Sequence, residues 1–143
     1  QEDDDKTIDF IISTYGGEAS ETFALYDIMR VVRKDCDIAT FGLGKVMSGG
    51  VLLLASGTKG KRKIGKNCRL MIHSVVGTSH GSLYSLENEM EEVRWIQERY
   101  TKALAEESKM TEKYIKEELF EKKMNVYLSA EEAVELGIAD EIV

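Results

Sequence analysis

Proline is absent from this chain, and cysteine and histidine occur only twice each. Without proline, the tight turns must depend on glycine, asparagine and aspartate. Cys36 and Cys68 lie within or beside apolar, strand-like segments, so we expect buried, reduced thiols that serve as packing residues. With so few cysteines and histidines, we expect neither a metal site nor any other cofactor.

Long apolar runs and an excess of positive charge are missing too. No apolar run approaches the roughly 20 residues that a membrane-spanning helix needs, so no membrane association is expected. The formal net charge of −7 argues against nucleic acid as a partner. The one basic cluster, residues 59–66, is interpreted as a solvated turn. No signal peptide is recognisable, which indicates a cytoplasmic protein. The chain opens on Gln1 and the acidic stretch Glu2–Asp5, which indicates a trimmed or partial chain.

What the chain does contain is a series of apolar segments that alternate between strand-like and helix-like spacing. Its 143 residues suffice for one domain, residues 1–143, with a substantial core. Strands are expected at 7–13, 36–43, 63–64, 69–73 and 138–143, and helices at 21–33, 48–55, 82–106, 111–122 and 130–136. Ser20, Thr111 and Ser129 are the expected caps of three helices. The alternation predicts a mainly parallel α/β domain.

The clearest candidate for a catalytic motif is a glycine-flanked serine between an apolar strand and the apolar helix that follows it. Ser48 stands in this turn, and His73 ends the next strand-like run. Glycines leave the hydroxyl accessible, and the backbone N–H groups beside it can bind a developing oxyanion. With a histidine as base, this arrangement is a serine acyl-transfer site. The alternative is that Ser48 is a small packing residue and His73 a structural one.

Several segments resemble the proteolytic subunit of the Clp protease, ClpP. They are Gly44-x-x-x-Ser48-x-Gly50, Ala55-x-Gly57-x-Lys59-Gly-Lys-Arg62, Met71-Ile-His73 and the run from Tyr127 to Asp140. The resemblance implies a ClpP/crotonase-like fold of stacked ββα units with a long handle helix, here residues 82–106. It also implies a homo-oligomer of heptameric rings that stack in pairs around a chamber. An AAA+ unfoldase feeds polypeptide substrates to this chamber. Family members carry a longer segment before the equivalent of Thr7.

The same resemblance implies a role for each residue of the site. Ser48 is the nucleophile, and His73 is the base that later protonates the leaving amine. The N–H groups of Gly17 and Gly49 form the oxyanion hole. An extended substrate backbone pairs with a short strand at 76–77 and with the segment after the first strand. The residues expected to bind substrate are Gly17, Glu18, Ala19, Val76 and Gly77.

The third member of the triad departs from the family pattern. Asn125 stands at the position of the family's aspartate, after a segment that is longer than usual. Asparagine can orient the imidazole through its carbonyl oxygen, but it cannot balance the positive charge that forms there. Either Asn125 completes a slow triad, or a carboxylate from the longer segment does so, or the subunit is catalytically idle. The candidate carboxylates are Glu117, Glu118 and Glu121.

Other positions depart as well. Tyr15 replaces the proline before the glycine pair, and Gly49 replaces a methionine, which keeps the oxyanion donor but loosens the turn. Val126 replaces an arginine that forms an ion pair between rings, so stacking is expected to be weaker or to use other contacts. Lys45 offers a Ser–Lys dyad, but its spacing points it elsewhere.

The leading function is therefore a cytoplasmic serine endopeptidase. The alternatives are an idle ring or scaffold subunit and an acyl-CoA enzyme of the crotonase group, against which the Ser–His pair argues.

Overall fold

The computed structural model describes residues 6–122 and 124–143, so the acidic stretch Glu2–Asp5 lies outside the described residues. The elements in chain order are β1 (Ile8–Thr14), α1 (Ala19–Val32), β2 (Ile38–Met47), α2 (Gly49–Ala55), β3 (Arg62–Ile64), β4 (Arg69–Ile72), α3 (Leu83–Glu107), α4 (Glu112–Tyr114), the π-helix η1 (Ile115–Phe120), β5 (Val126–Leu128), α5 (Ala130–Glu135) and β6 (Glu141–Ile142). Strands and helices alternate through most of the chain, and the predicted α/β class is confirmed.

The sheet is built around β2, which pairs in parallel with β1, β3 and β4. Its residues 40–42 lie beside β3, and its last residues, 45–47, lie beside β4. β3 continues in parallel to β6. β5 was not anticipated as a strand, and it pairs with β4 in the antiparallel sense, with Ile72 opposite Val126. The carboxyl ends of β2 and β4 therefore lie side by side, and they carry Ser48 and His73.

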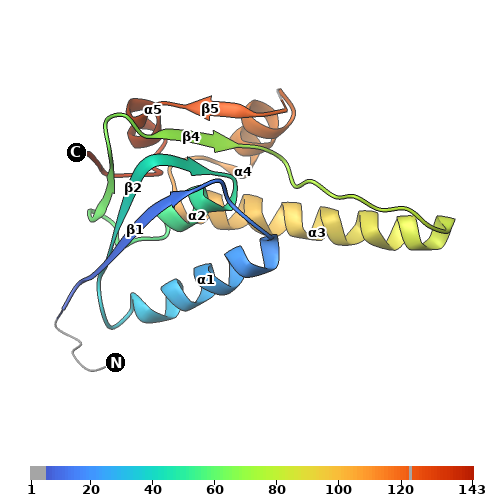
Figure 1. Cartoon of the computed structure of the whole chain (residues 1–143), viewed down its shortest axis with the longest axis horizontal. Coiled ribbons are helices and arrows are strands. Elements are labelled where there is room, and N and C mark those ends of the chain that lie inside the picture. Colours follow the sequence, from blue (N-terminus) through green and yellow to red (C-terminus); the bar gives the residue numbers. More distant parts are fainter. Residues whose placement is uncertain (1–5, 123) are drawn as a thin grey trace.

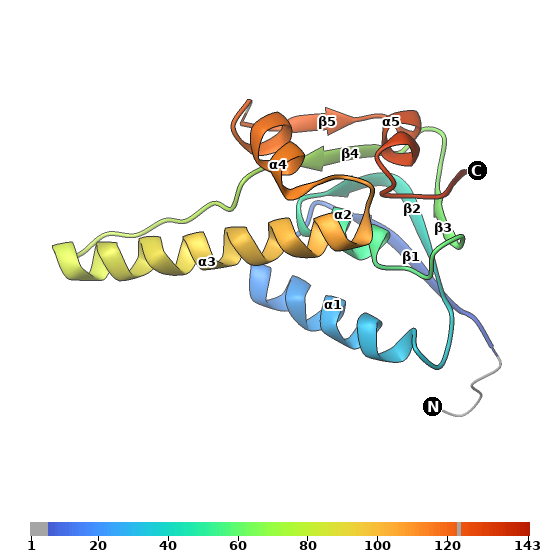
Figure 2. The same ribbon diagram turned by 180° about the vertical axis from the view of Figure 1, so that it is seen from behind.

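The short helix α2 forms the centre of the core. All seven of its residues are buried, as expected for a segment that is apolar on every side. It contacts β1, β2 and β4 of the sheet and also packs against α1 and α3. Figures 1 and 2 show α2 enclosed between the strands and these two helices. The N-terminal end of this buried helix is where Ser48 stands, so the rigid core positions the serine.

The 25-residue helix α3 projects far beyond the rest of the molecule in both views (Figures 1 and 2). Residues 73–82 leave β4 and run outward to its far end. The strand expected at Val76–Gly77 is wrong, because β5 pairs with β4 only as far as Ile72 and no neighbouring strand continues beyond it. The segment instead contacts α3, where the Val75 N–H donates to Gln97 Oε1 at 2.7 Å. No helix in the described part of the chain is both long and apolar enough to cross a membrane.

Two further expectations are wrong. Ser20 does not cap α1, because the helix begins at Ala19 with Glu18 as its N-cap. Ser20 lies inside the first turn, which is closed by the hydrogen bond from the Thr22 N–H to the Glu18 carbonyl. The basic cluster is not a solvated turn throughout, since Arg62 is only 4% exposed and pairs with Asp140 at 2.7 Å. The partner that makes this burial possible lies far away in the sequence.

Candidate active site

Ser48 occupies the turn between β2 and α2 in an unusual backbone conformation. Its φ is 55° and its ψ is −124°, and no other non-glycine residue among those described has a positive φ. Such conformations cost on the order of 1–3 kcal/mol and concentrate at functional sites. Hydrogen bonds on both sides hold the turn. The Ser48 N–H donates to the Met71 carbonyl at 2.7 Å, and the Ser48 carbonyl accepts from the Val51 N–H and the Tyr100 hydroxyl, each at 3.1 Å.

Two glycines let neighbouring segments approach this turn closely. Gly16 has a φ of +101°, and a Cβ there would lie 2.7 Å from the Cβ of Ser48. A Cβ on Gly49 would collide with the side chain of Thr22, a buried residue of α1. Thr22 thus fills the space beside Gly49, which gives a steric reason for glycine at this position.

The amides of Gly17 and Gly49 are both available to a ligand. Neither N–H finds a hydrogen-bond acceptor within residues 6–122 and 124–143. The Gly49 amide belongs to the first turn of α2, whose N–H groups have no acceptor inside their own helix. Both residues line the cavity that contains Ser48. Free amides beside a serine can donate to an anionic oxygen.

One cavity of about 570 Å³ brings Ser48 and His73 together. All five residues expected to bind substrate also line it: Gly17, Glu18, Ala19, Val76 and Gly77. The other lining residues come from the β1–α1 connection, α1, α2, the segment after β4, and α3: Tyr15, Thr22, Phe23, Gly49, Val75, Glu89, Glu92, Val93, Ile96 and Tyr100. Two segments without regular structure, one after β1 and one after β4, thus meet at the serine.

His73 takes its orientation from its own backbone neighbour. Its Nδ1 lies 2.5 Å from the carbonyl oxygen of Ser74. Because a carbonyl oxygen can only accept, this bond assigns the ring proton to Nδ1 and leaves the lone pair of Nε2 free to act as a base. No hydrogen bond joins the ring to the Ser48 hydroxyl in the described residues.

Asn125 is not joined to His73 by a hydrogen bond in the part of the chain that the structure describes. It is exposed and lies outside the lining of the Ser48 cavity. The pairing of β4 with β5 ends at Ile72 and Val126. His73 follows Ile72 and Asn125 precedes Val126, so each of the two residues stands one position beyond the last backbone pair.

The other candidate partners of the catalytic pair, three glutamates and one lysine, make no hydrogen bond or ion pair with Ser48 or His73 among the residues described. Glu118 pairs with Lys122 at 2.8 Å. Glu117 and Glu121 make no side-chain hydrogen bond or ion pair among the residues described, and neither lines the Ser48 cavity. The Lys45 ammonium lies 4.5 Å from the centroid of the Tyr15 ring, and Lys45 is not part of the cavity lining.

Sequence reasoning missed three groups at this site, namely the Tyr100 hydroxyl, the Ser74 carbonyl and the Thr22 side chain. Tyr100 lies on the apolar stripe of α3, where hydrophobic spacing predicts only a packing residue. A tyrosine on a buried stripe carries a hydroxyl that needs a partner, and this was the available signal. Backbone carbonyls carry no signal in a sequence.

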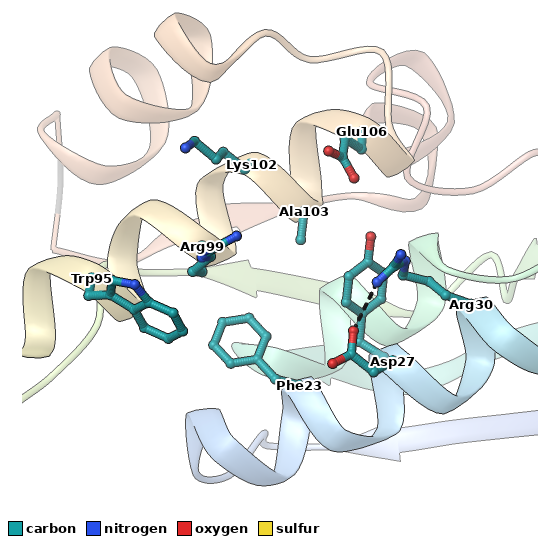
Figure 3. A pocket seen from close by; sticks show the side chains of 9 residues that line it. Phe23, Asp27, Arg30, Trp95, Arg99, Lys102, Ala103 and Glu106 are labelled. Atoms are coloured by element: carbon teal, nitrogen blue, oxygen red, sulfur yellow. Dashed lines mark hydrogen bonds and ion pairs between the residues drawn. The ribbon is translucent and has the colours of Figure 1, made fainter.

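A second cavity, of about 500 Å³, lies between α1 and α3 (Figure 3). Its lining residues are Phe23, Tyr26, Asp27, Arg30, Trp95, Arg99, Lys102, Ala103 and Glu106. Arg30 pairs with Asp27 at 3.0 Å, and the Arg99 guanidinium lies 5.0 Å from the centroid of the Trp95 ring. This lining contains no serine, cysteine or histidine, so it offers neither a nucleophile nor a base for acyl transfer.

In a comparison with protein-family models, the chain matches the model described as Clp protease. The match spans residues 1–143, which is the whole chain. It therefore includes the Ser48 turn, His73 and the segment that contains Asn125.

Proposed function

The chain belongs to the Clp protease family, and on that premise we propose that it is a serine endopeptidase that cleaves unfolded polypeptides. The observation that carries the proposal is the strained Ser48 turn, which opens into the same cavity as His73. Strain of this kind persists only where the surrounding structure enforces it, and enzymes use it to present reactive groups.

In the proposed reaction, the Oγ of Ser48 attacks the carbonyl carbon of the scissile peptide bond while Nε2 of His73 accepts its proton. The oxygen of the tetrahedral intermediate accepts hydrogen bonds from the Gly17 and Gly49 amides. The imidazolium then protonates the leaving amine, and the C–N bond breaks to leave an ester on Ser48. A water molecule, deprotonated by the same imidazole, hydrolyses this ester. Each oxyanion donor contributes about 10²–10³ to the rate.

The proposed substrate mode is backbone pairing. The connection after β1 and the segment around Val76 both lack regular structure and both line the cavity. An extended polypeptide between them can form the hydrogen bonds of an added strand. Such pairing reads the backbone rather than the side chains, so we expect broad sequence tolerance.

The family generally forms oligomeric rings that work with unfoldases. For this chain we propose heptameric rings, stacked in pairs through the projecting part of α3, in the cytoplasm and supplied by an AAA+ unfoldase. The proposal is supported by the large apolar side chains that α3 leaves exposed beyond the body of the molecule.

A specific observation favours a second candidate, an idle ring subunit that retains the fold and modulates active partners. Within the described residues, His73 makes no hydrogen bond to Ser48 or to Asn125, and its Nδ1 is satisfied by the neutral Ser74 carbonyl. A subunit in which the His73 ring never contacts the Ser48 hydroxyl would be unable to activate the serine.

A fluorophosphonate probe separates the two candidates. We expect the intact protein to be labelled at Ser48, as mapped by mass spectrometry, and we expect His73→Ala to abolish labelling. The matched control is His80→Ala, which removes the other histidine of the chain, an exposed residue, and should leave the labelling rate unchanged. Labelling that is absent from Ser48, or that is equally fast in His73→Ala, would establish the idle subunit instead.

A further inference from the structure

Tyr100 links the projecting helix to the Ser48 turn. It is the first buried residue of α3, with a side chain 9% exposed, and its ring packs on Phe120 at a centroid distance of 6.2 Å. Its hydroxyl donates to the Ser48 carbonyl at 3.1 Å, and the residue also lines the Ser48 cavity. A buried tyrosine hydroxyl cannot hydrogen-bond to bulk water, so the Ser48 carbonyl supplies the acceptor that this hydroxyl needs.

The carbonyl that Tyr100 binds belongs to the same peptide group as the Gly49 N–H. A trans peptide group is planar, and its C=O and N–H point in opposite directions. A bond that fixes the oxygen therefore also fixes the direction of the amide hydrogen. The same oxygen accepts the Val51 N–H at 3.1 Å. The peptide group is thus anchored through its oxygen by two donors, while its N–H remains free at the cavity.

Gly49 makes this anchor necessary. A peptide group turns most easily when the following residue has no Cβ, because glycine tolerates nearly every φ. Rotation of the Ser48–Gly49 peptide would carry the N–H away from the cavity. Burial raises the pKa of the Tyr100 phenol, which therefore stays protonated and remains a donor over the ordinary pH range. A donor on the carbonyl also polarises the peptide group and strengthens its N–H as a donor in turn.

We propose that Tyr100 is a positioning residue for the oxyanion hole, because its hydroxyl holds the Ser48–Gly49 peptide in the orientation that presents the Gly49 N–H to the reacting carbonyl. The inference rests on the proposed function, since it concerns the oxyanion of that reaction. Tyr100 acts on the transition state through the backbone and does not touch the reacting atoms.

The test replaces the hydroxyl alone. Tyr100→Phe keeps the ring and its contact with Phe120, and we expect a fall of about tenfold in kcat for a fluorogenic peptide with little change in KM. The affinity for a peptide boronate, whose tetrahedral adduct on Ser48 places an oxygen at the oxyanion position, should fall by a similar factor. Removal of an interaction that acts only in the transition state lowers kcat and leaves KM nearly unchanged.

Tyr26→Phe is the matched control. Tyr26 is also a buried tyrosine on a helix, and its hydroxyl bonds to Glu107 at 3.2 Å, outside the Ser48 cavity. We expect this variant to lose stability but to keep the wild-type kcat and boronate affinity. If Tyr100 had a structural role alone, the two variants would behave alike.

Failure of the inference and failure of the proposed function give different results. An active wild type with a Tyr100→Phe variant of equal kcat and boronate affinity overturns the inference and leaves the peptidase intact. A wild type that neither turns over peptide nor reacts with a fluorophosphonate overturns both. If thermal unfolding shows that Tyr100→Phe is not folded, Tyr100→Met removes the same hydroxyl. Loss of folding in both variants assigns Tyr100 a structural role and overturns the inference.

Discussion

His73 is oriented by a backbone carbonyl and not by a side chain. The Ser74 oxygen, 2.5 Å from Nδ1, selects the tautomer in which Nε2 carries the lone pair. A triad carboxylate does this too, and in addition it balances the charge of the imidazolium that forms during the reaction. The neutral Ser74 carbonyl and the neutral Asn125 amide cannot supply that charge. In the proposed reaction, therefore, His73 is oriented but lacks a counter-charge.

Asn125→Asp should supply this charge. Residues 125 and 73 each stand one position beyond the last pair of β5 and β4, so we expect a carboxylate at position 125 to lie close enough to stabilise the imidazolium. We expect peptidase kcat/KM to rise at least about tenfold. The upper limit is about 10⁴-fold, which is the loss when the triad aspartate of one serine protease is replaced by asparagine. The measurement is steady-state hydrolysis of a fluorogenic peptide.

Met124→Asp is the control for Asn125→Asp. It adds the same charge one residue away at an 86% exposed position. We expect no gain, because residue 124 lies further along the chain from the Val126–Ile72 pair and its side chain is largely in solvent, where water screens the added charge. If Asn125→Asp is no faster than wild type, Asn125 is not the third member of the triad.

At the level of the elements, Arg62 of β3 joins the ends of three helices. Its Nη1 donates to the Ala55 carbonyl at 3.1 Å, the Glu107 carbonyl at 2.7 Å and the Gly137 carbonyl at 2.9 Å. The last carbonyls of a helix lack intrahelical partners and carry partial negative charge, so a cation there is favourable. Asp140 completes the arrangement, since it accepts from Nε at 2.9 Å and from Nη2 at 2.7 Å.

Asp140 should make the stability of the fold depend on pH in the acid range. Burial alone would raise the pKa of Asp140, but hydrogen bonds from the Arg62 side chain and from the Arg62 and Gly60 amides outweigh burial and lower it to about 2. The folded-state value lies below the ordinary 3.8, so the stabilisation is present above about pH 4 and is lost as the pH falls toward 2. It amounts to about 2 kcal/mol.

Urea unfolding of wild type and Asp140→Asn at pH 7, 4 and 2.5 measures this contribution. We expect the variant to be less stable at pH 7 and the difference from wild type to shrink toward pH 2.5. Asp27→Asn is the control, because the exposed pair of Asp27 with Arg30 contributes little. A difference that stays constant with pH would contradict the prediction.

At the level of the whole molecule, α3 leaves a stripe of apolar side chains without a partner. Leu83, Leu86 and Met90 are 65%, 37% and 55% exposed, and no residue of α3 before Tyr100 is buried. An ordinary surface helix packs its apolar stripe on its own domain, whereas the first half of α3 projects beyond the rest of the molecule (Figure 2) and its apolar side chains are exposed there. Exposed apolar stripes of this kind mark contact surfaces between molecules.

If rings stack through this stripe, as proposed above, Met90→Lys should weaken the stacking. A lysine at an apolar interface loses hydration without gaining a partner, so we expect the largest assembly to separate into particles of about half its mass. Native mass spectrometry and sedimentation velocity measure this directly. The control is Asn88→Lys, which adds the same charge two residues away on a different face of α3. An unchanged mass for Met90→Lys would exclude this stripe from the assembly.

Features that depend on neighbouring residues can be predicted from the amino-acid sequence alone. The α/β class, the burial of α2 and the caps at Thr111 and Ser129 are confirmed, since each follows from hydrophobic spacing or from a hydroxyl next to free amides. Cys36 and Cys68 are free and buried, as expected. The glycine-flanked serine also predicted the turn between strand and helix at Ser48, because such a turn depends only on local backbone geometry.

Which distant groups meet depends on the packing of the whole fold. The bond from Tyr100 to the Ser48 carbonyl, the burial of Arg62 beside Asp140 and the pairing of β4 with β5 next to His73 all join residues far apart in the chain. Position in the sequence fixes spacing along an element, but the crossing of elements depends on how the whole core packs. A hydroxyl on an apolar stripe and an arginine in a basic cluster acquire their roles from that packing.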